Sequence, residues 1–187
     1  MRIIAGTARG VRLGRVPRGT RPVSDRAREG LFSSLGSEVV DSTVLDLFAG
    51  TGAIGMEALS RGAAEATFVD RSGAAVASIR DNLDRTRLAD AAKAVSSGVE
   101  GFLAAGPPTP GPPVDLVFLD PPYDIAGEEL SGLLHVLETR WLNGRAGWKV
   151  CLTRSARSST VVVPIGWVVA RRLEYGDNLV ICYRREE

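Results

Sequence analysis

The sequence predicts an α/β protein with a doubly wound, mostly parallel seven-stranded sheet that ends in a C-terminal antiparallel hairpin. Two observations support this prediction. Short apolar segments alternate with segments of helical spacing through most of the chain, and the last two apolar segments are separated only by the turn Gly176-Asp177. We divide the chain into a small N-terminal β-hairpin extension, residues 1–22, and a main domain, residues 23–187.

The composition is that of an ordinary globular protein. The 187 residues are 44% apolar and 24% charged, and we expect neither a membrane span nor a signal peptide. Cys151 and Cys182 both lie in apolar, strand-like segments, which favours reduced, buried thiols and a cytoplasmic setting. With His135 as the single histidine, we expect no metal centre and no histidine-based triad. We also expect a monomer.

The elements of the first half follow from capping residues and glycines. Residues 1–22 contain alternating apolar positions around Gly6 and Gly10, as in a β-hairpin. Ser24 is an N-cap for a helix that Gly36 ends. The segments that follow are predicted as a strand at Val44–Phe48, a helix through Met56 and Leu59 to Gly62, a strand at Ala66–Val69, a helix at 73–88, a strand at Ala92–Ser96 and a helix at Val99–Ala105.

The second half begins with a loop, residues 106–113, that holds five prolines and two glycines. After it we predict a strand at 115–119, a helix at Glu128–Arg140, a strand at Gly147–Leu152 and three closing apolar segments at Val161–Val163, Trp167–Tyr175 and Asn178–Tyr183.

The strand at 115–119 breaks off at Asp120-Pro121-Pro122-Tyr123. Two prolines cannot continue a strand, and they stiffen the turn that follows. The end of the strand therefore presents a carboxylate, free backbone carbonyls and an aromatic ring. Taken alone, this tetrapeptide is equally well explained as an acidic turn without function.

A glycine loop follows the first strand of the sheet. Gly50, Gly52 and Gly55 fit the pattern G-x-G-x-x-G, and Asp70 lies about 20 residues further on, at the end of the next strand. In an open α/β sheet, ligands bind beyond the carboxyl ends of the strands. The pattern fits NAD, FAD or S-adenosylmethionine, or a plain strand–helix turn. Asp46, inside the strand, favours S-adenosylmethionine because it could orient the loop or meet the ligand's ammonium group.

Together, the two strand ends suggest methyl transfer to an exocyclic amine. Such an amine is a poor nucleophile because its lone pair is delocalised into the ring. Acceptors at Asp120 and the Pro121 carbonyl would favour the pyramidal amine and stabilise the positive charge that develops on nitrogen. Tyr123 could stack on the base. A base inside a helix must be flipped out to reach such a site.

The N-terminus is strongly basic. Residues 1–30 hold eight arginines against two acids, a net charge of +6 in a chain whose total is +1. Arginine suits bidentate phosphate contacts, and a basic end on an acidic body indicates nucleic-acid binding. A solvated charged arm and an Arg-rich transit peptide are the alternatives, and the alternating hairpin pattern disfavours the second. The predicted RNA-binding residues are Arg2, Arg9, Arg12, Arg15, Arg18 and Arg21.

Several motifs resemble those of the RsmD-type methyltransferases. They are Asp46-Leu47-Phe48-Ala49-Gly50-Thr51-Gly52, Asp120-Pro121-Pro122-Tyr123, Arg2-Ile3-Ile4-Ala5-Gly6 with Arg9-Gly10, and Arg21-Pro22-Val23-Ser24-Asp25-Arg26-Ala27-Arg28-Glu29. The resemblance implies a Rossmann-like class I methyltransferase fold. It also implies transfer from S-adenosylmethionine to N2 of a guanine in bacterial 16S ribosomal RNA, naked or within a small ribosomal subunit.

The resemblance also implies roles for individual residues. Ala49, Gly50, Thr51 and Gly52 would line the methionine end of the cofactor, Asp70 would hold the ribose hydroxyls and Arg71 would lie by the adenine. Many relatives have Asp or Asn after the third strand to bind the adenine amine. Here Ser97-Gly98 occupies that place, so a Ser97 hydroxyl or a backbone group would substitute.

Three alternatives remain open at this stage. The same chemistry could act on adenine N6 in DNA or on a protein glutamine. The chain could instead be a non-catalytic RNA-binding or assembly factor with a vestigial fold, although the intact Asp120 and glycine loop argue against this. A dinucleotide oxidoreductase is the third alternative, but it has no evident use for Asp120-Pro121-Pro122-Tyr123.

Overall fold

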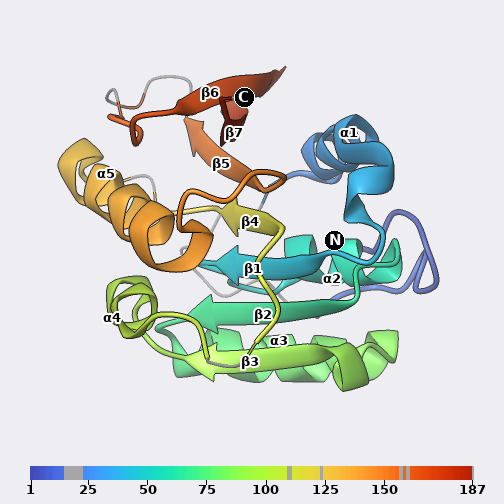
Figure 1. The fold of residues 1–187 in the computed structure, drawn as a ribbon. Coiled ribbons are helices and arrows are strands. Elements are labelled where there is room, and N and C mark those ends of the chain that lie inside the picture. The colour runs from blue at the N-terminus through green and yellow to red at the C-terminus, as the bar shows by residue number, and fades with distance from the viewer. Residues whose placement is uncertain (15–22, 109–110, 123, 156–157, 159–160, 187) are drawn as a thin grey trace.

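The computed structural model describes residues 1–14, 23–108, 111–122, 124–155, 158 and 161–186. It shows a single twisted sheet with helices on both faces (Figure 1). The strands are β1 (Thr43–Leu47), β2 (Glu65–Asp70), β3 (Ala92–Ser96), β4 (Leu116–Leu119), β5 (Lys149–Ser155), β6 (Trp167–Tyr175) and β7 (Asn178–Arg185). The main helices are α1 (Asp25–Leu35), α2 (Ala53–Ser60), α3 (Gly73–Thr86), α4 (Val99–Ala105) and α5 (Gly127–Val136).

The strand order confirms the predicted fold class. The seven strands lie in the order β3-β2-β1-β4-β5-β7-β6, with parallel pairing from β3 to β5 and antiparallel pairing of β7 with β5 and β6. The chain winds outward from β1 in one direction to β3 and then in the other direction from β4. The order therefore reverses between β1 and β4, which is where ligands bind in open α/β sheets.

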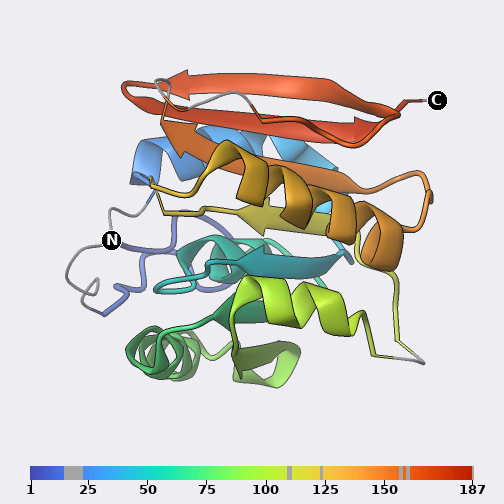
Figure 2. The ribbon, with the colours of Figure 1, turned by 90° about the vertical axis from the view of Figure 1, so that its left-hand side faces the viewer.

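Each face of the sheet has its own apolar core. In Figure 2, α4 and α5 lie in front of the sheet and α1 lies behind it. β4 supplies both cores because a strand's side chains alternate between faces: Leu116 and Phe118 pack on the side of α1–α3, and Val117 and Leu119 pack on the side of α4 and α5. This burial on both faces explains why β4 is an uninterrupted apolar run in the sequence.

Residues 1–14 fold back onto the main domain as a hairpin-like arm. A bridge between Arg2 and Arg12 joins its two sides, and Ile3, Ala8 and Leu13 are buried in the core beneath α1–α3. Gly6 has a φ of 81°, and a Cβ there would lie 1.6 Å from the Ser60 carbonyl oxygen, so only glycine fits this turn. Residues 15–22, the rest of the predicted extension, lie outside the described residues.

Two local predictions needed correction. Val161–Val163 do not form a strand, and β6 begins only at Trp167. The helix predicted at Glu128–Arg140 is α5 followed by a π-helical turn at Leu137–Leu142, which ends at Asn143 with a φ of 46°. Periodicity could not detect this turn because its apolar residues Leu137, Trp141 and Leu142 still face the core.

Cys151 and Cys182 are buried, free thiols, as predicted, and the structure places them directly opposite each other on β5 and β7. Burial raises the pKa of the Cys151 thiol well above its ordinary value. In the part of the chain that the structure describes, no helix has the length and apolar character of a membrane span.

Candidate active site at the carboxyl ends of β1, β2 and β4

The glycine loop between β1 and α2 has an unusual backbone. Phe48, Gly50 and Gly52 have φ values of 58°, 55° and 75°, so three of five consecutive residues lie in the left-handed region. Glycine adopts this region freely, whereas Phe48 does so at a cost. Gly50 faces open space, because a Cβ built there meets no atom within 4 Å. The backbone at Gly50 therefore borders open space at the point where the strand order reverses.

Asp46 fixes the start of the helix behind this loop. Its carboxylate is 1% exposed, and its Oδ2 accepts a 2.9 Å hydrogen bond from the backbone N–H of Gly55. A Cβ on Gly55 would lie 2.4 Å from the Phe68 ring, so glycine is required for this close approach of α2 to β2. Desolvation, opposed by the Gly55 hydrogen bond, raises the pKa of Asp46 to about 8. Asp46 therefore contacts the helix that follows the loop.

Asp70, at the end of β2, ties the second strand to the loop. Its Oδ2 accepts from the Gly50 N–H at 2.9 Å, and its Oδ1 accepts from the Ser72 N–H at 2.8 Å. Each carboxylate oxygen has a further lone pair, so the group can still accept hydrogen bonds from a ligand's hydroxyls. The structure thus brings together Gly50 and Asp70, which the glycine motif alone placed about 20 residues apart.

The residues that follow β3 contact the end of β2. The Ser97 N–H donates to the Asp70 carbonyl at 3.0 Å, and the Ser97 hydroxyl donates to the Gly98 carbonyl at 3.0 Å. The hydroxyl oxygen keeps acceptor capacity in this arrangement. Arg71, next to Asp70, is exposed. The residues predicted to bind the cofactor therefore lie along the ends of three neighbouring strands.

Asp120 follows β4, the strand on the other side of β1. Leu119 pairs with Leu47, and the Asp120 N–H donates to the Leu47 carbonyl at 3.4 Å, so the acid lies beside the start of the glycine loop. Desolvation raises the pKa of Asp120 to about 7. Pro121 is buried and Pro122 is exposed, while Tyr123 lies outside the described residues.

Sequence reasoning missed two buried polar residues that hold the N-terminal arm, one of which also holds the loop. Asn82 of α3 is fully buried, and its side chain donates to the Thr51 carbonyl at 3.0 Å and accepts from the Gly14 N–H at 2.7 Å. Glu57 of α2 is also fully buried, and it accepts from the N–H groups of Ile4 and Ala5 at 2.8 and 3.0 Å.

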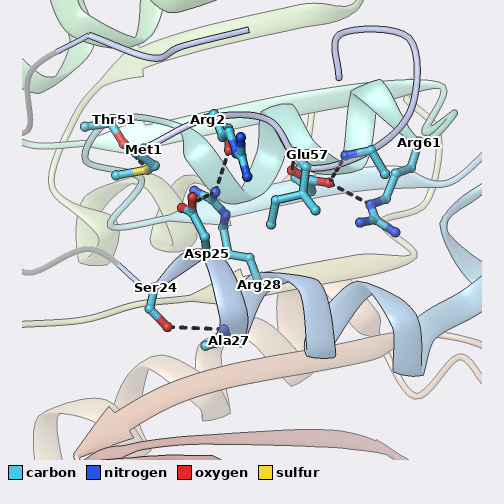
Figure 3. A network of polar contacts seen from close by, with 11 residues as sticks. Met1, Arg2, Ser24, Asp25, Ala27, Arg28, Thr51, Glu57 and Arg61 are labelled. Carbon is cyan, nitrogen blue, oxygen red and sulfur yellow. Dashed lines mark hydrogen bonds and ion pairs between the residues drawn. The ribbon is translucent and has the colours of Figure 1, made fainter. Parts of the chain in front are cut away.

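The sequence contains a weak indication of these two buried residues. A polar residue at each of these positions breaks the apolar face of a helix, and a buried polar group requires a partner. Figure 3 shows Glu57 between the arm and Arg61, whose Nε donates to it at 2.8 Å.

Of the arginines predicted to contact RNA, Arg2, Arg9 and Arg12 are exposed on the arm. Arg15, Arg18 and Arg21 lie outside the described residues. The arm's apolar residues face inward and its described arginines face outward, so the arm presents positive charge to solvent at low cost in packing.

These features define the fold of a Rossmann-like methyltransferase. An RNA methyltransferase from Salinibacter ruber, solved in complex with S-adenosyl-L-homocysteine, shares this fold at a TM-score of 0.66 and 15% identity over 89% of this chain and 95% of its own. A solved structure of Escherichia coli yhhF superposes with a TM-score of 0.82 and 35% identity over 100% of this chain and 98% of that one.

Closer relatives identify the family. A family model described as "Conserved hypothetical protein 95" matches residues 1–184. The Ribosomal RNA small subunit methyltransferase D of Escherichia coli (strain K12) is 38% identical over 100% of this chain and 90% of its own length, and that of Haemophilus influenzae is 31% identical over 98% and 92%. The chain belongs to this family, the RsmD-type methyltransferases.

Proposed function

We propose that this protein transfers a methyl group from S-adenosylmethionine to the exocyclic N2 amine of a guanine in 16S ribosomal RNA. The observation that carries this proposal is the position of Asp120, whose desolvated carboxylate lies beside the glycine loop at the reversal point of the sheet. Membership of a family whose relatives are named ribosomal RNA small subunit methyltransferases supports the substrate class.

The residues at the strand ends fit this cofactor. Gly50 leaves open space above an exposed backbone, and Asp70 offers acceptor oxygens to ribose hydroxyls. Ala49, Thr51 and Gly52 would complete the loop for the methionine end, with Asp46 holding α2 behind it, and Arg71, Ser97 and Gly98 would contact the adenine. When bound, the sulfonium supplies an already activated methyl group, so the chain's own residues need chiefly to position the amine.

Asp120 and Pro121 act on the amine. The carboxylate accepts a hydrogen bond from one N–H of the guanine amine and the Pro121 carbonyl accepts from the other, which directs the nitrogen lone pair outward. The negative charge of Asp120 also stabilises the positive charge that builds on nitrogen as the new bond forms. Tyr123 would stack on the base and hold it in the site.

The RNA itself would be held by the arginines of the arm. The side chains of Arg2, Arg9 and Arg12 are exposed, while the apolar residues of the arm are buried. Further along the sequence, the arginines continue with Arg15, Arg18 and Arg21. Phosphate contacts of this kind position a nucleic acid, while the pocket around Asp120 selects the base.

The decisive experiment measures labelled methyl transfer to unmodified small subunits, naked 16S ribosomal RNA, DNA and protein, followed by identification of the methylated nucleoside or amino acid. We expect N2-methylguanosine in the 16S ribosomal RNA, whether naked or within subunits. Methylated adenine or glutamine as the product would show that the amine was assigned wrongly. RNA binding without any transfer would identify a non-catalytic factor.

A further inference from the structure

A cleft outside the active site lies between the N-terminal arm and the first turns of α1. It has a volume of about 350 Å³. Its walls come from residues 2–4 and 9–10 of the arm and from Asp25, Arg26 and Glu29 of α1. Three of these residues, Arg2, Arg9 and Arg26, are exposed cations, and Arg26 was not among the arginines expected to contact RNA.

Two residues of the cleft wall, Asp25 and Arg2, contact a buried cation that does not itself line the cleft. Arg28 is 0% exposed, and its Nη2 donates to the Asp25 carboxylate at 2.9 Å and to the Arg2 carbonyl at 2.7 Å. In Figure 3 its side chain extends from α1 towards these two residues of the cleft wall. Its Nε and Nη1 have no hydrogen-bond partner among the described residues. Buried polar groups are normally satisfied, so this guanidinium is an exception that requires an explanation.

The charges of the cleft favour an anion. Asp25 is already paired with Arg28, which leaves Glu29 as the one unpaired acid among the wall residues, against three exposed arginines. The charges of Arg28 and Asp25 offset each other, so the positive potential of the cleft comes from the three exposed arginines. The bidentate geometry of arginine fits a phosphate group in particular.

The sequence links this cleft to RNA. The chain that joins its two walls, residues 11–24, carries Arg12, Arg15, Arg18 and Arg21 and no acidic residue. This run of positive charge along the sequence favours a polyanion such as RNA as the ligand.

We propose that this cleft binds a backbone phosphate of the substrate RNA, with Arg2, Arg9 and Arg26 as its ligands, while the buried Arg28 holds the two walls together through Asp25 and the Arg2 carbonyl. The proposal rests on the proposed function for the identity of the polyanion. It extends the RNA-binding surface from the arm to α1. It also assigns the positioning of the RNA to residues other than Asp120, which acts on the amine.

The test uses Arg26→Ala and Glu29→Gln, two exposed positions whose change leaves the core intact. Affinity for unmodified 16S ribosomal RNA is measured by filter binding at several salt concentrations, with steady-state methyl transfer alongside. Arg26→Ala should weaken binding roughly three- to tenfold, lower the salt slope by about one and raise KM without changing kcat. Glu29→Gln should strengthen binding, because it removes the negative charge of the unpaired acid in the cleft wall.

Arg85→Ala serves as the control, since it removes an exposed arginine on the last turn of α3, outside the cleft. A salt slope in Arg26→Ala equal to that of the control and the unaltered protein would overturn the proposed phosphate site while leaving the methyltransferase function standing. An unaltered protein that binds no RNA would instead overturn the proposed function, and the phosphate site with it.

Discussion

The side-chain amide of Asn82 donates a 3.0 Å hydrogen bond to the backbone carbonyl of Thr51, within the glycine loop. The same side chain accepts from Gly14 of the N-terminal arm at 2.7 Å. One buried residue of α3 thus holds both the proposed cofactor loop and the proposed RNA-binding arm. The two ligand-binding regions are therefore parts of one packed unit.

Replacing Asn82 with Ala should affect stability and cofactor binding together. The change leaves the Thr51 carbonyl and the Gly14 N–H without a partner, at about 1–3 kcal/mol for each group that becomes buried and unpaired. We expect a lower free energy of unfolding in urea and a larger dissociation constant for S-adenosylmethionine in calorimetry. Asp81→Asn, at the exposed neighbouring position, is the control. Loss of stability with unchanged cofactor affinity would show that Asn82 does not position the loop.

The raised pKa of Asp120 predicts a pH dependence of methyl transfer. Below a pKa of about 7 the carboxyl is protonated and its negative charge is absent, so kcat should rise with pH and level off above about 8. Asp120→Asn should remove this rise and lower kcat by roughly 10²–10³-fold, since it removes the charge that faces the developing cation. Asp124→Asn, four residues further on and exposed, should keep the unaltered profile. If the rise persists in Asp120→Asn, another group titrates.

Asp46 predicts a pH dependence of stability. Its pKa is about 8 in the folded protein against an ordinary value of 3.8, so between these values the folded state holds a proton that the unfolded state has released. The free energy of unfolding should therefore fall as pH rises from about 4 to about 8, by up to about 1.4 kcal/mol per pH unit for this group.

Asp46→Asn tests this directly, because the amide oxygen can still accept from Gly55 but does not titrate. Urea unfolding at pH 5, 6, 7 and 8 should show a shallower loss of stability in the variant. Some slope should remain, because the pKa of Asp120 is also raised. Parallel curves for the two proteins would mean that Asp46 is ionised throughout this range.

The contacts of Asp70 predict a strong effect on the cofactor site. Asp70→Ala removes the acceptor for Gly50 and Ser72 as well as the proposed acceptor for the ribose. We expect much weaker cofactor binding in calorimetry. Asp90→Ala, an exposed acid before β3, is a matched control. A dissociation constant for S-adenosylmethionine that does not change in Asp70→Ala would refute the ribose role.

The buried apolar residues and the exposed arginines of the arm should have different effects when they are removed. Deleting residues 1–14 would remove Ile3, Ala8 and Leu13 from the core and take from Glu57 the two N–H donors of the arm, so we expect the loss of several kcal/mol of stability. Arg12→Ala, at an exposed position, should leave the unfolding free energy within about 0.5 kcal/mol and lower the salt slope of RNA binding by about one. An Arg12→Ala protein with an unchanged slope would exclude this arginine from the RNA contact.

The sequence by itself determined the fold class, the order of the strands along the chain and the two motifs of the site. Period-two and period-3.6 patterns, glycines and prolines act locally, so they mark the buried strand before Asp120 and the turn at Gly50 without knowledge of the rest of the chain. The motifs also suggested that the ends of β1, β2 and β4 meet, because parallel strands end at one edge of a sheet.

The tertiary structure decided how these parts hold one another. Asp46 and Asp70 bond backbone N–H groups of α2 and the loop, Asn82 and Glu57 anchor the arm, and the buried Arg28 donates to the Arg2 carbonyl. These contacts join residues 9 to 68 positions apart, and no local pattern specifies which buried polar group meets which partner. The raised pKa values of Asp46 and Asp120 likewise come from desolvation, which exists only once the chain has packed around them.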